Sequence, residues 1–237
     1  SPELAILAGG IVAGLLGAVF GWVAIRRQGI YFAMITVAIA EVFFFVEFNP
    51  LSDFTGGENG LPGVPTPSLN LGFTTINFNT DWTLYVFLAF WYFVGLVIAL
   101  RIVRSPVGAV LSAIRDNPLR AQAIGIPVER RLVAVCTLAA AYAGAAGALI
   151  AQTTMFVSLD AAALHRSAEA LIVLVLGGTG WLYGGLVGAL AFKLLQDALS
   201  ALTPHYWQFW MGLILVAVVL VGRDRIAAGL DRLRGRG

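Results

Sequence analysis

The chain alternates long apolar runs with polar segments. The apolar tracts fall at residues 4–24, 30–48, 82–100, 132–157, 164–202 and 207–222. About 20 apolar residues are enough for a helix to cross the hydrocarbon core of a bilayer. The pattern therefore predicts an all-α fold, a polytopic membrane helix bundle that forms one transmembrane domain over residues 1–237.

The fifth tract, 164–202, is interrupted by Gly177-Gly178-Thr179-Gly180 and by Gly184-Gly185. We expect a short helix near 164–176, a Gly-rich reversal, and a longer helix near 181–202. The first piece is too short to span comfortably, and broken helices are tolerated at membrane depth inside a protein. A re-entrant loop followed by one crossing is the alternative, and the pattern leaves both open.

Small residues recur at three- and four-residue spacing in two tracts. They are Gly10, Gly14, Gly17 and Gly21 in the first tract, and Ala140, Gly144, Gly147 and Ala148 in the fourth. Small side chains let helix backbones approach closely within a membrane. We therefore expect these residues to form packing faces between helices.

The distribution of charge orients the bundle. Only 12% of the residues are charged and 59% are hydrophobic, a composition that excludes an ordinary soluble domain. Thirteen of the 15 basic residues lie between the first and second tracts, between the third and fourth, or after the last, whereas segment 49–81 has none. Since short basic loops stay in the cytoplasm, we expect segment 101–131 and the basic tail 223–237 inside, and loop 49–81 outside.

The residue inventory excludes several kinds of chemistry. The one lysine, Lys193, is not in a Gly-Lys-Ser/Thr sequence, so no Walker A motif of that kind is present. The one cysteine, Cys136, excludes an internal disulfide and a CxxC site. No HExxH sequence occurs. We expect no catalytic residue, no metal site and no cofactor bound by this chain, so that any ATP is hydrolysed by a separate chain.

Segment 101–131 is too long for a simple connection between helices. Ser105-Pro106 is typical of an N-cap followed by the first helical residue. One apolar stripe follows, at Val107, Val110, Leu111 and Ile114. Asp116-Asn117-Pro118 ends this helix and caps a second, which Gly125 ends. Two amphipathic helices between spans lie on the lipid surface or dock into a partner protein, and the pattern alone leaves both open.

Glu41 lies near the middle of the second tract, 30–48. An unpaired carboxylate at that depth is costly, so we expect it to be paired, protonated or facing a water-filled path. A polar clamp between helices and a place on a translocation path are equal alternatives.

Four segments carry a resemblance to a known family. They are Gly29-Ile30-Tyr31-Phe32-Ala33-Met34-Ile35-Thr36, Thr55-Gly56-Gly57-Glu58-Asn59-Gly60-Leu61, the run from Gly108 to Asn117 with Ala121, Ala123, Ile124, Gly125 and Ile126 after it, and Leu176-Gly177-Gly178-Thr179-Gly180 with Tyr183-Gly184-Gly185. In this order they resemble the permease subunits of ATP-driven (ABC) importers of the branched-chain amino-acid class, the LivM type. The resemblance covers most of residues 25–222.

Two departures from that family accompany the resemblance. Glu41 stands where family members often have an uncharged polar residue. The chain starts at Ser1 instead of a methionine, and permeases of this kind usually carry further N-terminal spans, so we expect a trimmed form of a longer protein.

The resemblance implies roles for two sets of residues. Segment 101–131 would hold a coupling helix seated on a cytoplasmic ATPase. Its contact residues would be Ala113, Ile114, Arg115, Asp116, Asn117, Arg120 and Gly125. Residues of the translocation path or the substrate site would be Tyr31, Thr36, Glu41, Thr55, Gly56, Gly57, Asn59, Gly177, Gly178 and Gly180.

The resemblance further implies a transport subunit of the bacterial inner membrane, with its C-terminus in the cytoplasm. Its partners would be ABC ATPase subunits, a second, LivH-like permease subunit, membrane lipid, and a periplasmic or extracellular solute-binding protein, with no nucleic acid. Loop 49–81 would receive the binding protein, unless it is a passive linker. Branched-chain amino acids are the expected substrates, with urea, amides and aromatic acids as alternatives within the family.

Two other classes of function compete with this interpretation. An intramembrane enzyme is disfavoured, because the sequence has no GxSG motif, no paired intramembrane aspartates and no metal cluster. An ion-coupled secondary transporter or channel for a small polar solute is the stronger alternative. Glu41 and the Gly-broken tract 164–202 are the features that favour it.

Overall fold

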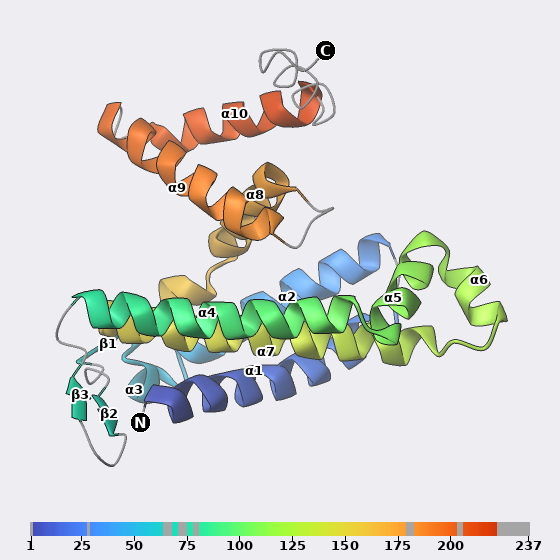
Figure 1. The fold of residues 1–237 in the computed structure, drawn as a ribbon, viewed down its shortest axis with the longest axis horizontal. Helices are drawn as coiled ribbons and strands as arrows, with labels where there is room; N and C mark the ends of the chain where they lie inside the picture. The colour runs from blue at the N-terminus through green and yellow to red at the C-terminus, as the bar shows by residue number, and fades with distance from the viewer. Residues whose placement is uncertain are drawn as a thin grey trace. The chain divides into compact units, whose positions relative to one another are not determined.

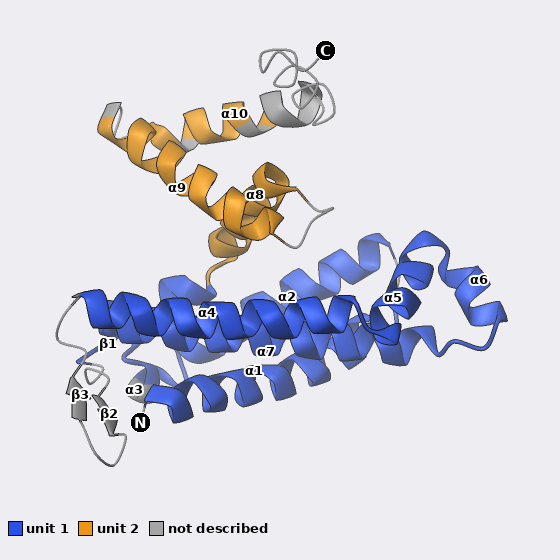
Figure 2. Cartoon of the chain, viewed as in Figure 1, with its two compact units in different colours: residues 1–162 blue, residues 163–237 orange. Residues whose placement is uncertain are grey.

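The structure, a computed structural model, describes residues 2–27, 29–63, 68–70, 75–77, 81–178, 183–202 and 206–221. The chain divides into two compact units, Ser1–Ala162 and Ala163–Gly237 (Figure 2). In the described part, four helices are long and apolar enough to cross a membrane, and all four belong to the first unit. The predicted all-α fold is confirmed.

The four long helices of the first unit are α1 (Pro2–Ala24), α2 (Ile30–Phe48), α4 (Asp81–Val103) and α7 (Val128–Thr154) (Figure 1). They correspond to the first four apolar tracts. Helix α7 begins four residues before its tract, because Glu129, Arg130 and Arg131 continue the helix into the polar segment. A carboxylate in the first turn of a helix also interacts favourably with the helix dipole.

Short elements fill the connections of the first unit. After α2 come α3 (Ser52–Thr55), the 3₁₀ turn η1 (Gly57–Asn59) and strands β1 (Leu61–Pro62), β2 (Ser68–Asn70) and β3 (Thr75–Asn77). Strands β2 and β3 pair antiparallel with each other. Strand β1 pairs antiparallel with β4 (Phe156–Val157), so that Leu61 lies opposite Val157. A second 3₁₀ turn, η2 (Leu159–Ala162), ends the unit. The sequence did not predict these strands, since two or three residues are too few to show an alternating pattern.

Helices α1 and α7 pack antiparallel along the predicted small residues. A Cβ atom added to Gly17 would overlap the Cβ of Ala140, and one added to Gly21 would lie 3.0 Å from the Cβ of Cys136. The backbones therefore meet with no room for larger side chains. Gly147 is the exception, because it faces open space. Ala148, the next residue, does contact α1. Consecutive residues of a helix point about 100° apart, so Gly147 is turned away from α1.

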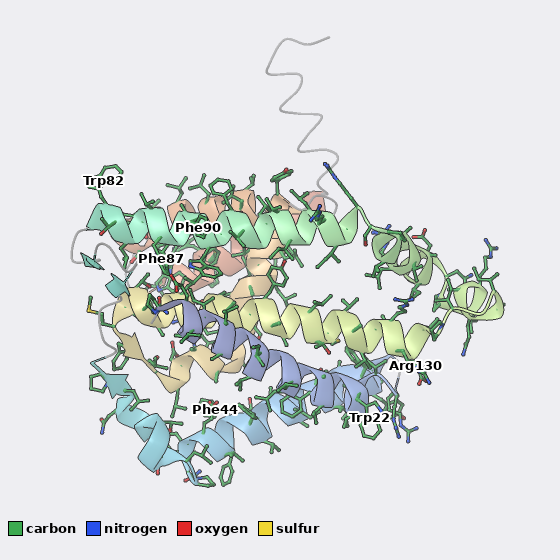
Figure 3. All side chains as sticks on the ribbon, turned by 60° about the horizontal axis from the view of Figure 1, so that its bottom comes forward. Trp22, Phe44, Trp82, Phe87, Phe90 and Arg130 are labelled. Atoms are coloured by element: carbon green, nitrogen blue, oxygen red, sulfur yellow. The ribbon has the colours of Figure 1, made fainter. Side chains whose placement is uncertain are left out.

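Helix α4 packs on the same pair of helices. Phe87 on α4 and Ile6 on α1 are buried together, with Trp91 and Leu149 packed against them. Phe87 points from α4 into the unit, whereas Phe90 points away from it (Figure 3). Tyr142 Oη on α7 donates a hydrogen bond of 3.0 Å to the carbonyl oxygen of Gly95. These contacts make α4 antiparallel to α7.

The basic residues of the first unit gather at one end. Helices α1 and α4 end there, and the antiparallel α7 begins there, next to the short helices α5 (Pro106–Asp116) and α6 (Pro118–Ala123) (Figure 1). All of these basic side chains are exposed: Arg26, Arg27, Arg101, Arg104, Arg115, Arg120, Arg130 and Arg131. Strand β1, with which β4 pairs, lies at the other end of the unit (Figure 1). This polarity agrees with the sidedness that the sequence predicts.

The second unit contains α8 (Leu164–Gly177), α9 (Gly184–Leu202) and α10 (Trp207–Val221). Helices α8 and α9 touch through their backbones, because a Cβ added to Gly188 would lie 2.8 Å from the amide nitrogen of Gly177. The predicted short helix is confirmed. At 1.5 Å per residue its 14 residues rise only about 21 Å, less than the bilayer core. The number of crossings stays a prediction, and the tail 223–237 lies outside the described residues.

Candidate functional site

The α5–α6 hairpin starts at a sharp corner after α4. Ser105 occupies the predicted N-cap position, with Pro106 as the first helical residue. Its hydroxyl does not cap α5, as the sequence suggested, but donates a 2.6 Å hydrogen bond back to the carbonyl oxygen of Ile102. Gly108 makes the corner possible, since an added Cβ would overlap the carbonyl group of Val103.

The connection from α5 to α6 follows the sequence prediction. Asn117 ends α5, and its side-chain oxygen accepts a 2.9 Å hydrogen bond from the amide nitrogen of Arg120. This bond satisfies one of the free N–H groups at the start of α6. Gly125 follows α6 with φ of +88°, a conformation that favours glycine. Asn117 and Gly125 therefore shape the hairpin, a role that does not require contact with a partner.

One face of the hairpin packs on the rest of the unit. Ile114 is 5% exposed and Ala121 is 2% exposed, whereas Val110 and Leu111 are half-buried. Val107, the first residue of the predicted stripe, is exposed at the edge of this face. Because Ile114 is buried within the chain, it is not available to a lipid surface or to a partner in this conformation.

The opposite face of the hairpin is a mixed surface, which we call the hairpin tip: Arg115, Asp116, Leu119, Arg120 and Ile124. Leu119 is 77% exposed and Ile124 is 71% exposed. Arg115 Nε lies 3.5 Å from Asp116 Oδ1, with both side chains largely exposed. Such an ion pair contributes about 0–1 kcal/mol to stability. The contact residues predicted from the sequence did not include Leu119 or Ile124, although two large apolar residues outside the amphipathic stripe were a usable signal.

At the other end of the unit, the glycine-rich segment 55–60 packs between the end of α2 and strand β4, which follows α7. Thr55 Oγ1 donates a 2.8 Å hydrogen bond to the carbonyl oxygen of Glu47. Gly56 and Gly57 follow with φ of +76° and +53°. A Cβ added to Gly60 would lie 2.8 Å from the ring of Phe156. Segment 55–60 thus contacts both the end of α2 and residues 156–157, and we call it the clasp. Thr55, Gly56 and Gly57 belong to it, and Asn59 is its exposed residue.

The predicted path residues of α2 do not converge on one site. Thr36 lines a groove of about 450 Å³ between α1, α2 and α7. The other residues that line this groove include Phe20, Phe32, Phe43, Cys136 and Ala139. The Thr36 hydroxyl donates into its own helix, 2.9 Å from the carbonyl oxygen of Ala33. Tyr31 is 66% exposed and does not line this groove.

Glu41 is exposed on the side of α2 that faces away from the groove. Glu41 follows Thr36 by five residues, so the two side chains point about 140° apart around the helix axis. Within the described part of the chain, its carboxylate has no hydrogen bond and no ion pair. The sequence predicted that Glu41 is paired, protonated or facing a water-filled path. Pairing is absent in the described part of its own unit.

The predicted glycines of the second unit lie at the end of α8. Gly177 and Gly178 are buried there, and a Cβ on Gly177 would overlap the carbonyl oxygen of Gly184. Gly180 lies outside the described residues. The described residues also contain no group of three or more His, Cys, Asp or Glu side chains that could hold a metal ion.

An all-α chain with apolar helices of this length, basic residues gathered at one end and a structured hairpin beyond the helices is a multi-pass membrane protein. Residues 1–219 match the family model described as the permease component of branched-chain amino acid transport systems, and the chain belongs to this family. The family indicated by the four sequence segments is thus confirmed.

Curated relatives agree with this assignment. The chain is 25% identical over 229 residues to the high-affinity branched-chain amino acid transport system permease protein LivM of Escherichia coli (strain K12). It is equally similar to the LivM protein of Salmonella typhimurium. In both cases the match covers 89% of this chain and 54% of the relative, so the chain spans about half the length of these relatives. No solved structure matches the chain.

Proposed function

We propose that this chain is the membrane-spanning permease subunit of an ATP-driven ABC importer for branched-chain or related amino acids. It forms part of the translocation path and couples that path to separate ATPase subunits, which use the ATP. The chain itself is a transport subunit that binds no cofactor and catalyses no reaction. Its family membership supports transport, and the hairpin tip is the observation that supports coupling.

The composition of the hairpin tip favours a protein partner over the lipid surface. A helix that lies on lipid turns its apolar face toward the acyl chains and its basic residues toward the headgroups. Here the apolar face, with Ile114 and Ala121, is buried in the chain. The exposed face combines Leu119 and Ile124 with charges of both signs. Asp116 would be repelled by anionic lipid, whereas a groove on a protein can accommodate both charges.

The remaining partners follow from the polarity of the first unit. The basic end of the first unit and the C-terminus lie on the cytoplasmic side of a bacterial inner membrane, which is also the side of the ATPase subunits. Loop 49–81 then lies outside and receives the solute-binding protein. A second, LivH-like permease completes the membrane-embedded part.

Substitution at the hairpin tip tests the coupling. Leu119→Asp and Ile124→Asp together should lower co-purification of the ATPase subunits about tenfold or more, as for central apolar residues of an interface. The amount of membrane-inserted permease should not change, because both side chains are exposed. Leu119→Met is the control and should keep the complex intact. Full ATPase recovery with the double variant would contradict docking at the tip.

An ion-coupled secondary transporter is the second candidate, because Glu41 is an unpaired carboxylate within an apolar helix. Reconstituted uptake separates the two functions. The importer requires ATP, the ATPases and the binding protein, and it continues when ion gradients are collapsed. Uptake that needs an ion gradient and no ATPase would establish the secondary transporter instead.

A further inference from the structure

The carboxylate of Glu41 has no cationic partner in the described part of its own unit. Leaving a charged side chain unpaired at the centre of a membrane helix is costly. Thirteen of the 15 basic residues belong to the predicted cytoplasmic segments; the others are Arg166 and Lys193. Arg166 lies 2.9 Å from Glu169, and Lys193 lies 3.7 Å from Asp197. Both cations thus already have acidic partners on their own helices.

The face of α2 that carries Glu41 is also hollowed. A shallow cavity of about 430 Å³ is lined by Ala33, Met34, Val37 and Ala38. Val37 and Ala38 precede Glu41 by four and three residues, so all three lie on one face of the helix. The hollow is apolar, and its residues Val37 and Ala38 precede Glu41 by about 4.5–6 Å along the helix axis, measured between Cα positions. We call Met34, Val37, Ala38 and Glu41 the Glu41 face.

A carboxylate beside an apolar hollow fits a small molecule with a primary ammonium group and an aliphatic body. The ammonium ion donates charge-assisted hydrogen bonds to the carboxylate, while the aliphatic part lies on Met34, Val37 and Ala38. Thr36, the hydroxyl of the other groove, donates to its own helix, and that groove offers no charged side chain. Of these two cavities, the hollow beside Glu41 is therefore the one with a charge complementary to the ammonium group of an amino acid.

We propose that the Glu41 face is a substrate-binding site on the translocation path: Glu41 binds the ammonium group of an aliphatic amino acid, and the hollow holds its side chain. This inference rests on the proposed function and adds the residues that recognise the substrate. A cation on a partner subunit is the competing occupant, and it predicts that Glu41 stabilises assembly instead of substrate binding.

Equilibrium binding of radiolabelled leucine tests the site. The assembled permease and ATPase complex is placed in nanodiscs without the binding protein, and 4-methylpentanoate, which has the leucine skeleton without the ammonium group, serves as the comparison. The wild-type complex should bind leucine at millimolar concentrations and should not bind 4-methylpentanoate. Glu41→Gln should weaken leucine binding about tenfold, as expected for loss of a hydrogen bond to a charged group. Glu47→Gln, on the same helix but outside the Glu41 face, is the matched control and should bind leucine normally.

Steric filling of the hollow gives a second readout. Ala38→Leu should lower the affinity for leucine more than the affinity for alanine, whereas Ile39→Leu, in the groove on the other side of α2, should change neither. Wild-type leucine affinity in Glu41→Gln, or no leucine binding to the wild-type complex, overturns the inference. Loss of the second permease or the ATPases from the Glu41→Gln complex also overturns it, because the cation then belongs to a partner. A different result would contradict the proposed function itself: a wild-type complex with no ATP-dependent uptake of any amino acid.

Discussion

Met155 ends α7 in the left-handed conformation, with φ of +52°, and is the non-glycine residue of the described chain with a positive φ. Its carbonyl oxygen accepts a 3.2 Å hydrogen bond from the amide nitrogen of Gly63. The turn thus positions β4 against β1, next to the clasp. For residues other than glycine, the left-handed conformation costs about 1–2 kcal/mol.

Met155→Gly should therefore stabilise the protein. The side chain is 43% exposed, so little packing is lost. We expect a gain of up to about 1 kcal/mol in the free energy of unfolding, partly offset by the greater freedom of glycine in the unfolded chain. Thermal unfolding of the purified complex measures this gain. Met155→Ala keeps the strained backbone and should give no gain; equal stabilisation by both variants would show that the backbone strain is not the cause.

Arg115 and Asp116 illustrate a different kind of residue, whose side chains contribute little to the fold. Exchanging the two, as Arg115→Asp with Asp116→Arg, keeps the local ion pair possible but reverses the pattern presented to a partner. We expect unchanged stability within about 0.5 kcal/mol and several-fold weaker ATPase association. Co-purification at several salt concentrations measures the effect. An exchange variant that binds like the wild type would show that the tip does not use these charges.

At the scale of elements, small residues decide which helices pack. The pairing of α1 with α7 joins residues more than 100 positions apart, such as Gly9 and Gly144. The sequence predicted both faces from their spacing, but it could not tell that they face each other or that Gly147 is turned away. Those facts depend on how the two helices are rotated about their axes.

Gly144→Ala and Gly147→Ala form a matched pair on one helix. The Cβ of alanine at position 144 would overlap Ala13 and the backbone of Gly9, whereas at position 147 it meets open space. Overpacking of this kind costs about 1–3 kcal/mol. Gly144→Ala should lower the thermal stability and Gly147→Ala should leave it unchanged or raise it. Equal effects of the two would mean that α1 and α7 do not pack on this face.

The α8–α9 hairpin permits the same comparison in the second unit. A Cβ at Gly188 would overlap the carbonyl oxygen of Val173, whereas Gly185 has no atom within 4 Å of an added Cβ. Gly188→Ala should therefore destabilise the hairpin by about 1–3 kcal/mol, measured as faster proteolysis of residues 163–202, and Gly185→Ala should not. Resistance of Gly188→Ala to the protease would contradict the backbone contact.

At the scale of the whole molecule, the polarity of the first unit makes a prediction about the membrane. The hairpin tip and the clasp lie at opposite ends of the same antiparallel helices. In a Cys136→Ala background, Leu119→Cys should react with a membrane-impermeant maleimide added from the cytoplasmic side only. Asn59→Cys should react from the outside only. Labelling of both cysteines from one side would contradict the proposed topology.

The sequence by itself determined the class of protein, the helices and the expected sidedness, because apolar length and the position of arginines act locally at each span. It also identified the α5–α6 hairpin, since the Asn117 cap and Gly125 are local signals. Only the tertiary structure showed that segment 55–60 is a clasp against residues 155–157, and that Ile114 is buried while Leu119 and Ile124 are exposed. Only the structure placed Thr36 and Glu41 on different sides of α2 relative to its neighbours. The physical reason is that burial and pairing depend on which helix faces approach one another, and that depends on long-range packing that no local pattern records.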